Sequence, residues 1–220
     1  ILATFLISSQ VRKKITKVKK KIKKFNLKKY NDVISNLNYE LTNDQINALS
    51  EINKDISSEY KMFRLLQGDV GSGKTIVSLL SALNVTEAGY QVAFMAPTEI
   101  LANQHYNLAR NLLGKYLSIE LITGHTTNQF KKKIQEKVNN KKIDLVIGTH
   151  SLFQKKMIFN NLGLIIIDEQ HKFGVNQRKK LSDKGGDNCD ILLMSATPIP
   201  RTLTMTIYGD MDLSIIKEKP

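Results

Sequence analysis

The sequence predicts an α/β fold, a three-layer sandwich with a mainly parallel central sheet, preceded by a basic amphipathic helix. Three observations lead to this prediction. From residue 62 onward, short apolar runs alternate with longer segments of helical periodicity, which is the pattern of strand–helix–strand units. The runs are short and mostly apolar, as expected for strands that are buried on both faces. The 220 residues are enough for one such domain with its own core.

The strands and helices are expected to alternate along the chain. The strands are predicted at residues 62–67, 91–95, 119–122, 144–147, 164–167 and 191–194. The helices are predicted at residues 73–87, 99–113, 128–139, 174–183 and 200–208. Residues 182–190 are polar and contain a Gly-Gly pair, so we expect an exposed loop there.

Residues 1–38 form a basic segment ahead of the sheet, which we predict to be a helical connector, and residues 39–220 form the second predicted domain. A helical conformation would give the connector one apolar stripe, made by Ile7, Val11, Ile15, Val18, Ile22 and Phe25. Three interpretations of this helix remain open. It could rest on a neighbouring domain with its basic faces in solvent, follow a nucleic-acid backbone, or lie on a membrane surface.

The net charge of +13 comes from 33 Lys and Arg residues against 20 acidic residues. It is concentrated near the N-terminus, because residues 1–40 hold eleven of the basic residues and only two of the acidic ones. Residues 41–220 therefore carry a net charge of only +4. The charge indicates a polyanionic partner, but most of it lies outside the predicted sheet.

Composition excludes several other classes of protein. The single cysteine, Cys189, cannot form an internal disulfide and fits a reducing, cytoplasmic location. The apolar start of the chain is too short to span a bilayer, so we expect no membrane segment. We also expect no zinc site, because His105, His125 and His150 lack the spacing of zinc ligands. The chain begins with isoleucine rather than methionine, which indicates a piece of a longer protein.

A phosphate-binding loop is predicted directly after the first strand. The pattern G-x-x-x-x-G-K-[ST] stands between a strand and a helix, the context in which it binds nucleotide phosphates. Glycines let backbone N–H groups point at phosphate oxygens, and the helix N-terminus adds a partial positive charge. Lys74 would reach the β- and γ-phosphates, and the Thr75 hydroxyl would bind Mg²⁺. No guanine-reading N-K-x-D pattern follows, so ATP is favoured. The loop residues expected to bind the nucleotide are Gly68, Gly71, Ser72, Gly73, Lys74 and Thr75.

Two carboxylates follow the apolar strand at residues 164–167. Strands of a parallel sheet release their C-terminal residues at the edge where α/β proteins bind ligands, which places Asp168 and Glu169 there. Asp168 would hold Mg²⁺, and Glu169 would orient or deprotonate an attacking water. A strand that merely ends in an acidic turn is the alternative. With Lys74, these carboxylates make up the predicted catalytic set, and ATP and Mg²⁺ are the expected cofactors.

These segments resemble the motifs of superfamily 2 helicases and appear in the order typical of them. The segment from Asp168 through Gln170 to His171 is similar to the DExH signature. Residues 41–45 resemble the adenine-reading glutamine motif of these proteins, residues 96–101 resemble motif Ia, and residues 195–197 resemble motif III. The resemblance implies a RecA-like fold for residues 39–220.

Within that superfamily, the closest resemblance is to the RecG family of branch-migrating DNA helicases. It rests on residues 68–75, 168–175 and 197–203. The related transcription-repair coupling factors usually have other residues at the positions of Ser72 and Gln170, which favours the RecG family.

The resemblance implies roles for further residues. Gln45 would read the edge of the adenine base. Small residues that follow three strands would contact DNA phosphates: Pro97, Thr98, Thr123, Gly124 and Thr149. A third set would couple the γ-phosphate site to the DNA: Gln170, His171, Ser195 and Thr197. Helix capping, ordinary turns and internal hydrogen bonds are the alternative roles for these residues.

The function implied by the resemblance is that of the ATP-binding motor lobe of a double-stranded DNA translocase or helicase. Such a protein remodels stalled replication forks and recombination junctions by branch migration, in DNA repair and recombination. Its partners would be branched DNA, a second RecA-like lobe and a wedge domain. Because the second lobe supplies the arginine fingers, we expect the chain alone to bind ATP·Mg²⁺ weakly and to hydrolyse it poorly. The alternatives are a coupling-factor motor lobe and a non-catalytic nucleic-acid-binding module.

Overall fold

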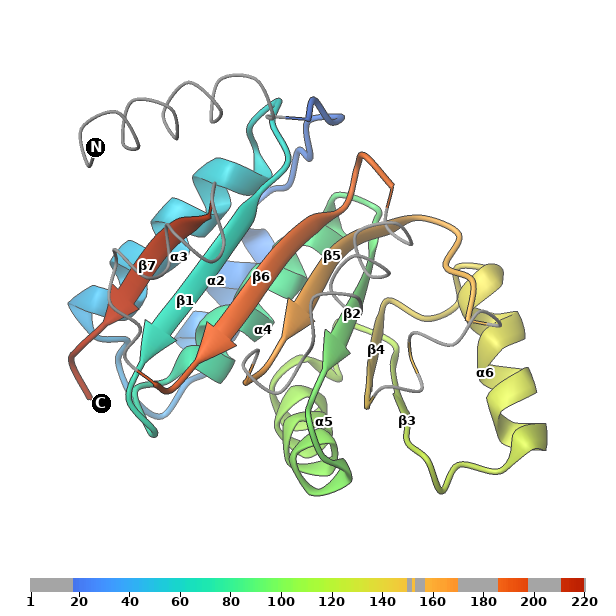
Figure 1. The fold of residues 1–220 in the computed structure, drawn as a ribbon. Helices are drawn as coiled ribbons and strands as arrows, with labels where there is room; N and C mark the ends of the chain where they lie inside the picture. The colour runs from blue at the N-terminus through green and yellow to red at the C-terminus, as the bar shows by residue number, and fades with distance from the viewer. Residues whose placement is uncertain (1–17, 150–151, 153–156, 170–185, 198–210, 220) are drawn as a thin grey trace, which may run out of the picture.

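The computed structural model describes residues 18–149, 152, 157–169, 186–197 and 211–219 of the 220-residue chain. Within these ranges seven strands form one sheet in which every neighbouring pair is parallel (Figure 1). The order across the sheet is β3-β4-β2-β5-β6-β1-β7. The predicted α/β fold with a parallel central sheet is confirmed.

Helices and strands alternate along most of the chain. The strands are β1 Phe63–Gly68, β2 Gln91–Met95, β3 Ile119–Ile122, β4 Leu145–Gly148, β5 Leu162–Ile167, β6 Asp190–Ser195 and β7 Asp212–Ile216. The helices are α2 Lys28–Ser35, α3 Asn43–Ile56, α4 Lys74–Glu87, α5 Glu99–Leu113 and α6 Asn128–Asn139. Among the described residues, no helix is long and apolar enough to cross a membrane.

Alternate residues of the strands supply separate cores on the two faces of the sheet. On β2, Phe94 belongs to the core that α2, α3, α4 and α5 cover, whereas Met95 belongs to the core on the opposite face. Helix α6 packs on that opposite face at the β3–β4 end, where its Ile134 and Val138 meet Val146 (Figure 1). The central strands β2, β4, β5 and β6 are therefore buried on both sides, which explains why their sequences are mostly apolar.

Most predicted elements lie where the sequence places them. The strands at 91–95 and 119–122 and the helices at 99–113 and 128–139 match the observed bounds. The other four predicted strands differ from theirs by one or two residues. The helices predicted at 174–183 and 200–208 lie outside the described residues. Helix α2 lies inside residues 1–38, the predicted helical connector, whereas α3 and the edge strand β7 were not predicted. The short sequence of β7 mixes polar and apolar residues.

The predicted amphipathic helix is wrong for residues 18–27, the described part of its apolar stripe. Residues 18–27 are not helical, and Lys19 forms an antiparallel bridge with Tyr60. Two residues of the predicted apolar stripe, Val18 and Ile22, are 44% and 52% exposed. A third, Phe25, packs against the core, and the other three, Ile7, Val11 and Ile15, lie outside the described ranges. Apolar spacing predicted the wrong conformation here because the side chains that anchor this segment are lysines.

Lys20 and Lys23 anchor the connector to Asp190, the first residue of β6. The Lys20 Nζ donates to both carboxylate oxygens at 2.6 and 2.7 Å, and the Lys23 Nζ donates to Oδ2 at 2.8 Å. The side chains of all three residues are 0% exposed. The prediction that residues 182–190 form an exposed loop is therefore wrong at Asp190, because the lysines draw its carboxylate into the interior.

Candidate functional site

The carboxyl ends of all seven strands meet at one edge of the sheet, and the predicted site residues follow these ends. The phosphate loop connects β1 to α4 at this edge (Figure 1). Gly71 and Gly73 have φ angles of 84°, in the left-handed region that glycine adopts without strain. Gly73 is also the N-cap of α4, so the loop leads directly into the positive end of a helix dipole.

Two glycines of the loop are required by close approach of other atoms. A Cβ added to Gly68 would lie 2.5 Å from Ser72 Oγ and 2.7 Å from the carbonyl oxygen of Ile216 on β7. A Cβ on Gly73 would lie 2.2 Å from the side-chain nitrogen of Gln45 on α3. The loop is therefore confined by β7 and α3, neither of which the sequence predicted.

The ammonium group of Lys74 lies back over the phosphate loop. Its Nζ donates to the carbonyl oxygens of Gly68 and Asp69 at 2.7 and 2.8 Å. Burial lowers the pKa of Lys74 from its ordinary value, and the negative charges of Asp168 and Glu169 oppose that shift. The predicted catalytic lysine is thus close enough to both predicted carboxylates to respond to their charge.

Gln45 is fully buried and joins α3 to the phosphate loop. Its Nε2 donates to the carbonyl oxygen of Ser72 at 2.9 Å, and its Oε1 accepts from the Thr42 backbone N–H at 3.0 Å. The Thr42 hydroxyl in turn accepts from the Gln45 backbone N–H, which completes a capping box at the start of α3. The sequence did not predict the contact with Ser72. Adenine reading by Gln45 stays a prediction.

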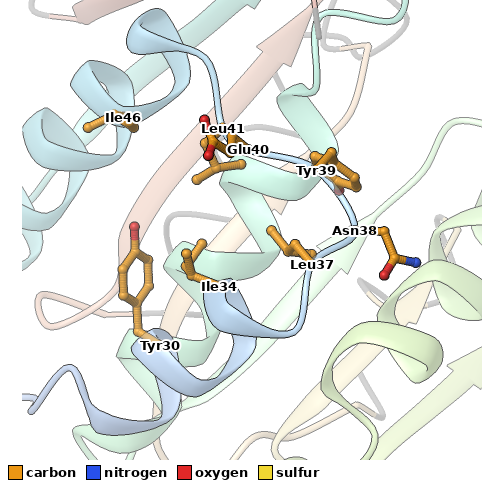
Figure 2. Close-up of a pocket in the computed structure, with 8 residues that line it drawn as sticks. All are labelled: Tyr30, Ile34, Leu37, Asn38, Tyr39, Glu40, Leu41 and Ile46. Carbon is orange, nitrogen blue, oxygen red and sulfur yellow. The ribbon is translucent and has the colours of Figure 1, made fainter.

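A pocket of about 630 Å³ lies between α2 and the start of α3 (Figure 2). Leu41 and Ile46, which flank the capping box in sequence, are among the residues that line it. Most of the remaining lining is also apolar or aromatic: Tyr30, Ile34, Leu37, Asn38, Tyr39 and Glu40. A cavity of this size with apolar walls is suitable for a flat, largely apolar group.

The two predicted carboxylates lie where β5 ends. The Asp168 backbone N–H donates to the Met95 carbonyl oxygen of β2 at 2.9 Å, which extends the sheet ladder by one residue. Glu169 follows with a φ of 50°, a left-handed conformation that is unusual for a non-glycine residue. Strained backbone of this kind concentrates at functional sites, so the turn supports a special role for the Asp-Glu pair.

The structure adds one residue to this site that the sequence did not indicate. His105 Nε2 on α5 lies 2.8 Å from Asp168 Oδ2, and the two side chains are 9% and 11% exposed. The sequence led us to consider this histidine only as a zinc ligand. Helix α5 follows β2, the neighbour of β5, but only the folded chain shows which side of the helix faces Asp168.

The residues present fit ATP and Mg²⁺. Ser72 Oγ is buried without a hydrogen-bond partner, inside a loop in which Gly68 and Gly73 leave no room for side chains. Thr75 and Asp168 are the candidate magnesium holders. No group of three or more His, Cys, Asp or Glu side chains within the described ranges could bind a metal. This is compatible with Mg²⁺, which takes one or two protein ligands and completes its shell with water and phosphate oxygens.

The predicted coupling residues are only partly described. Ser195 Oγ lies 2.9 Å from Thr197 Oγ1 and accepts from the Thr197 backbone N–H at 3.2 Å, so motif III forms a compact turn after β6. Gln170 and His171 lie outside the described residues.

The predicted DNA contacts gather at the ends of β2, β4 and β3, which are neighbours in the sheet. Thr98, which follows Pro97, caps α5 by accepting from the Leu101 backbone N–H at 3.3 Å. The adjacent Glu99 carboxylate accepts from the Gly124 backbone N–H at 2.6 Å. Across β3 and β4, the Thr149 backbone N–H donates to the Ile122 carbonyl oxygen at 3.3 Å, beside Thr123. The sheet edge thus divides into a candidate nucleotide half, at β5, β6 and β1, and a candidate DNA half.

Comparison with known proteins agrees with this arrangement. A model of the family described as DEAD/DEAH box helicase matches residues 42–206. The chain belongs to this helicase family.

Within the helicases, the chain is similar to proteins named ATP-dependent DNA helicase RecG. The RecG of Borreliella burgdorferi is 51% identical over 189 residues, which cover 86% of this chain and 27% of that relative. The RecG of Aquifex aeolicus is 53% identical over 189 residues, 85% of this chain and 24% of the relative. A solved structure of RecG bound to a three-way DNA junction matches with 46% identity and a TM-score of 0.83, over 96% of this chain and 28% of that one. The expected resemblance to RecG helicases is confirmed, and the chain spans about a quarter of the length of these relatives.

Proposed function

We propose that this chain is the ATP-binding motor lobe of a double-stranded DNA translocase that remodels stalled replication forks and recombination junctions by branch migration. The observation that carries the proposal is the phosphate loop, which leads from β1 through the left-handed Gly71 and Gly73 into the N-terminus of α4. Similarity to RecG helicases, one of them solved on a three-way DNA junction, supports branched DNA as the substrate. A second RecA-like lobe and a wedge domain, in a longer cytoplasmic protein, are the proposed partners.

The nucleotide would be held at both of its ends. Its phosphates would accept hydrogen bonds from the loop amides and from Lys74, and a triphosphate offers stronger, charged acceptors than the two carbonyl oxygens that Lys74 now contacts. The adenine base would lie in the pocket beside Gln45, against the half-exposed ring of Tyr39. Because Gln45 also contacts the phosphate loop through Ser72, base and phosphate recognition would share one side chain.

Hydrolysis would depend on the end of β5. Thr75 and Asp168 would hold Mg²⁺, which when bound would offset the negative charge of the transferring phosphate. Glu169 would orient the attacking water and accept its proton. Its left-handed backbone turns the chain away from the ladder directly after Asp168, so the neighbouring carboxylates can take different roles.

The DNA would run along the ends of β2, β3 and β4. The small side chains of Thr98 and Thr149, and the absence of one at Gly124, suit close approach of the phosphate backbone, contacts which position a duplex without reading its sequence. Ser195 and Thr197, with Gln170 and His171, would relay changes at the γ-phosphate towards this track. Such contacts are expected of a translocase that acts on DNA of any sequence.

The test begins with nucleotide binding by the purified chain. Lys74→Ala should weaken binding of a fluorescent ATP analogue by about tenfold or more, because a charge-assisted contact is lost. Lys137→Ala, which removes an exposed lysine from α6, is the matched control and should bind like the wild type. Equal affinity of the wild type and Lys74→Ala would contradict the nucleotide site.

A second measurement addresses the reaction. In the longer protein, Glu169→Gln should still bind ATP but lose DNA-dependent hydrolysis and branch migration of a synthetic three-way junction. Full branch migration by this variant, or by Lys74→Ala, would favour a non-catalytic nucleic-acid-binding module instead.

A further inference from the structure

We propose that His105 is a positioning residue for magnesium, which it assists by holding the Asp168 carboxylate in the orientation that the ion requires. The proposal rests on the proposed ATP·Mg²⁺ site and names a residue that is not part of the phosphate loop or the DExH signature. Three features of the fold support it: the contact itself, the packing of the imidazole ring, and the position of the histidine on α5.

The contact is short and lies in the interior. His105 Nε2 and Asp168 Oδ2 are 2.8 Å apart, and the residues are 7% and 8% exposed. An ionised carboxylate only accepts hydrogen bonds, so the imidazole nitrogen is the donor. A carboxylate has a second oxygen, so engagement of Oδ2 leaves Oδ1 as an acceptor for the ion or its water.

The imidazole ring is itself held in place. It stacks on the ring of Phe94, with 4.7 Å between the ring centroids and 27° between the planes. Phe94 is fully buried in β2, the strand that also accepts the backbone N–H of Asp168 through Met95. Both the main chain and the side chain of Asp168 are therefore oriented by β2 and by the helix that follows it. Groups that hold metal ligands in this way commonly contribute ten- to a hundredfold to metal affinity.

His105 lies on the helix that links the two halves of the sheet edge. Helix α5 begins with the cap at Thr98 in the candidate DNA half, and His105 lies two turns later, roughly 10 Å along the axis. One helix thus carries both a candidate DNA contact and the donor to the candidate magnesium carboxylate.

The experiment compares two substitutions that are both polar and differ in reach. In His105→Gln the amide nitrogen can occupy the place of Nε2, whereas in His105→Asn it stops at the place of Nδ1. For each variant of the purified chain, binding of a fluorescent ATP analogue is measured across a magnesium titration and again with the magnesium chelated. His125→Asn is the matched control, because that exposed histidine pairs with Glu99 instead.

We expect His105→Asn to raise the magnesium concentration for half-maximal binding by about tenfold or more, with magnesium-free binding unchanged. His105→Gln should restore most of the loss, and His125→Asn should match the wild type. A merely structural role would lower binding with and without magnesium to the same extent. If His105→Asn does not fold, His105→Phe, which keeps the ring and removes the donor, takes its place.

Two results would overturn the proposal, and they are distinguishable. If the wild type shows magnesium-dependent binding and His105→Asn has the same magnesium requirement, the positioning role is wrong while the nucleotide site stands. If the wild type itself binds ATP no better with magnesium, the proposed site fails and the role of His105 fails with it.

Discussion

Neutralising the carboxylate of the buried Lys20–Lys23–Asp190 cluster should strongly destabilise the fold. Asp190→Asn keeps the size of the side chain and removes the negative charge that balances two ammonium groups. All three side chains are 0% exposed, so these ammonium groups could not regain water without opening the structure. Removing one partner of a buried ion pair costs about 3–5 kcal/mol. Two lysines lose their counter-charge here, so we expect a loss near the upper end of that range.

The loss is measured by urea denaturation followed by circular dichroism. The matched control is Glu59→Gln, which breaks a pair that also joins the connector to the lobe, but with the Lys19 and Glu59 side chains 75% and 53% exposed. That substitution should change the unfolding free energy by less than about 0.5 kcal/mol. If Asp190→Asn is no more destabilising than Glu59→Gln, the connector does not depend on this buried charge.

The same cluster predicts a pH dependence with a definite sign. Burial lowers the pKa of Lys20 from its ordinary 10.5, and Asp190 opposes this shift. Between the lowered pKa of the folded state and the ordinary pKa of the unfolded state, Lys20 binds more protons in the unfolded chain than in the folded one. The contribution of Lys20 to the unfolding free energy therefore rises with pH across this range. Asp190→Asn removes the opposing charge and lowers the folded pKa further. The unfolding free energy of the variant should therefore begin to rise at a lower pH than that of the wild type.

Three further predictions concern single residues. Gly73→Ala should destabilise the chain by more than Gly89→Ala in urea denaturation. Both glycines have φ angles near 84°, but of the two only Gly73 has another atom where the added Cβ would lie. Equal losses of about 1–2 kcal/mol would show that the backbone conformation alone decides the cost. Glu99→Gln should bind a labelled duplex about fivefold more tightly in fluorescence anisotropy, since a carboxylate beside the Gly124 N–H repels phosphate. Unchanged or weaker binding would remove that part of the DNA half. Cys189 should not react with iodoacetamide at pH 8 until the chain unfolds, because burial raises its thiol pKa to about 12; rapid labelling of the native chain would contradict its burial.

The short-range patterns predicted the sheet and the phosphate loop well. Mostly apolar runs such as 91–95 and 164–167 are strands, because both of their faces are covered. The spacing of Gly71, Gly73 and Lys74 indicated a strand–loop–helix turn, since the left-handed conformations and the helix start all lie within a few residues. Features of this kind depend on neighbours in sequence and can be predicted from the sequence alone.

Side-chain partners from distant segments could not be predicted in this way. The lysines at 20 and 23 are more than 160 residues from Asp190, and apolar spacing suggested a helix where the chain is extended. His105 and Asp168 are 63 residues apart and meet only because β2 and β5 are neighbours.

By itself the sequence determined the fold class, the phosphate loop, the acidic pair at the end of β5 and the helicase resemblance, because each of these depends on local periodicity or on a contiguous motif. The tertiary structure alone decided the order β3-β4-β2-β5-β6-β1-β7, and with it the separation of a candidate nucleotide half from a candidate DNA half. It also decided that His105 faces Asp168 and that two lysines are buried against Asp190. The physical reason is that strand order and the burial of charge depend on which distant segments pack together, and no local pattern encodes that choice.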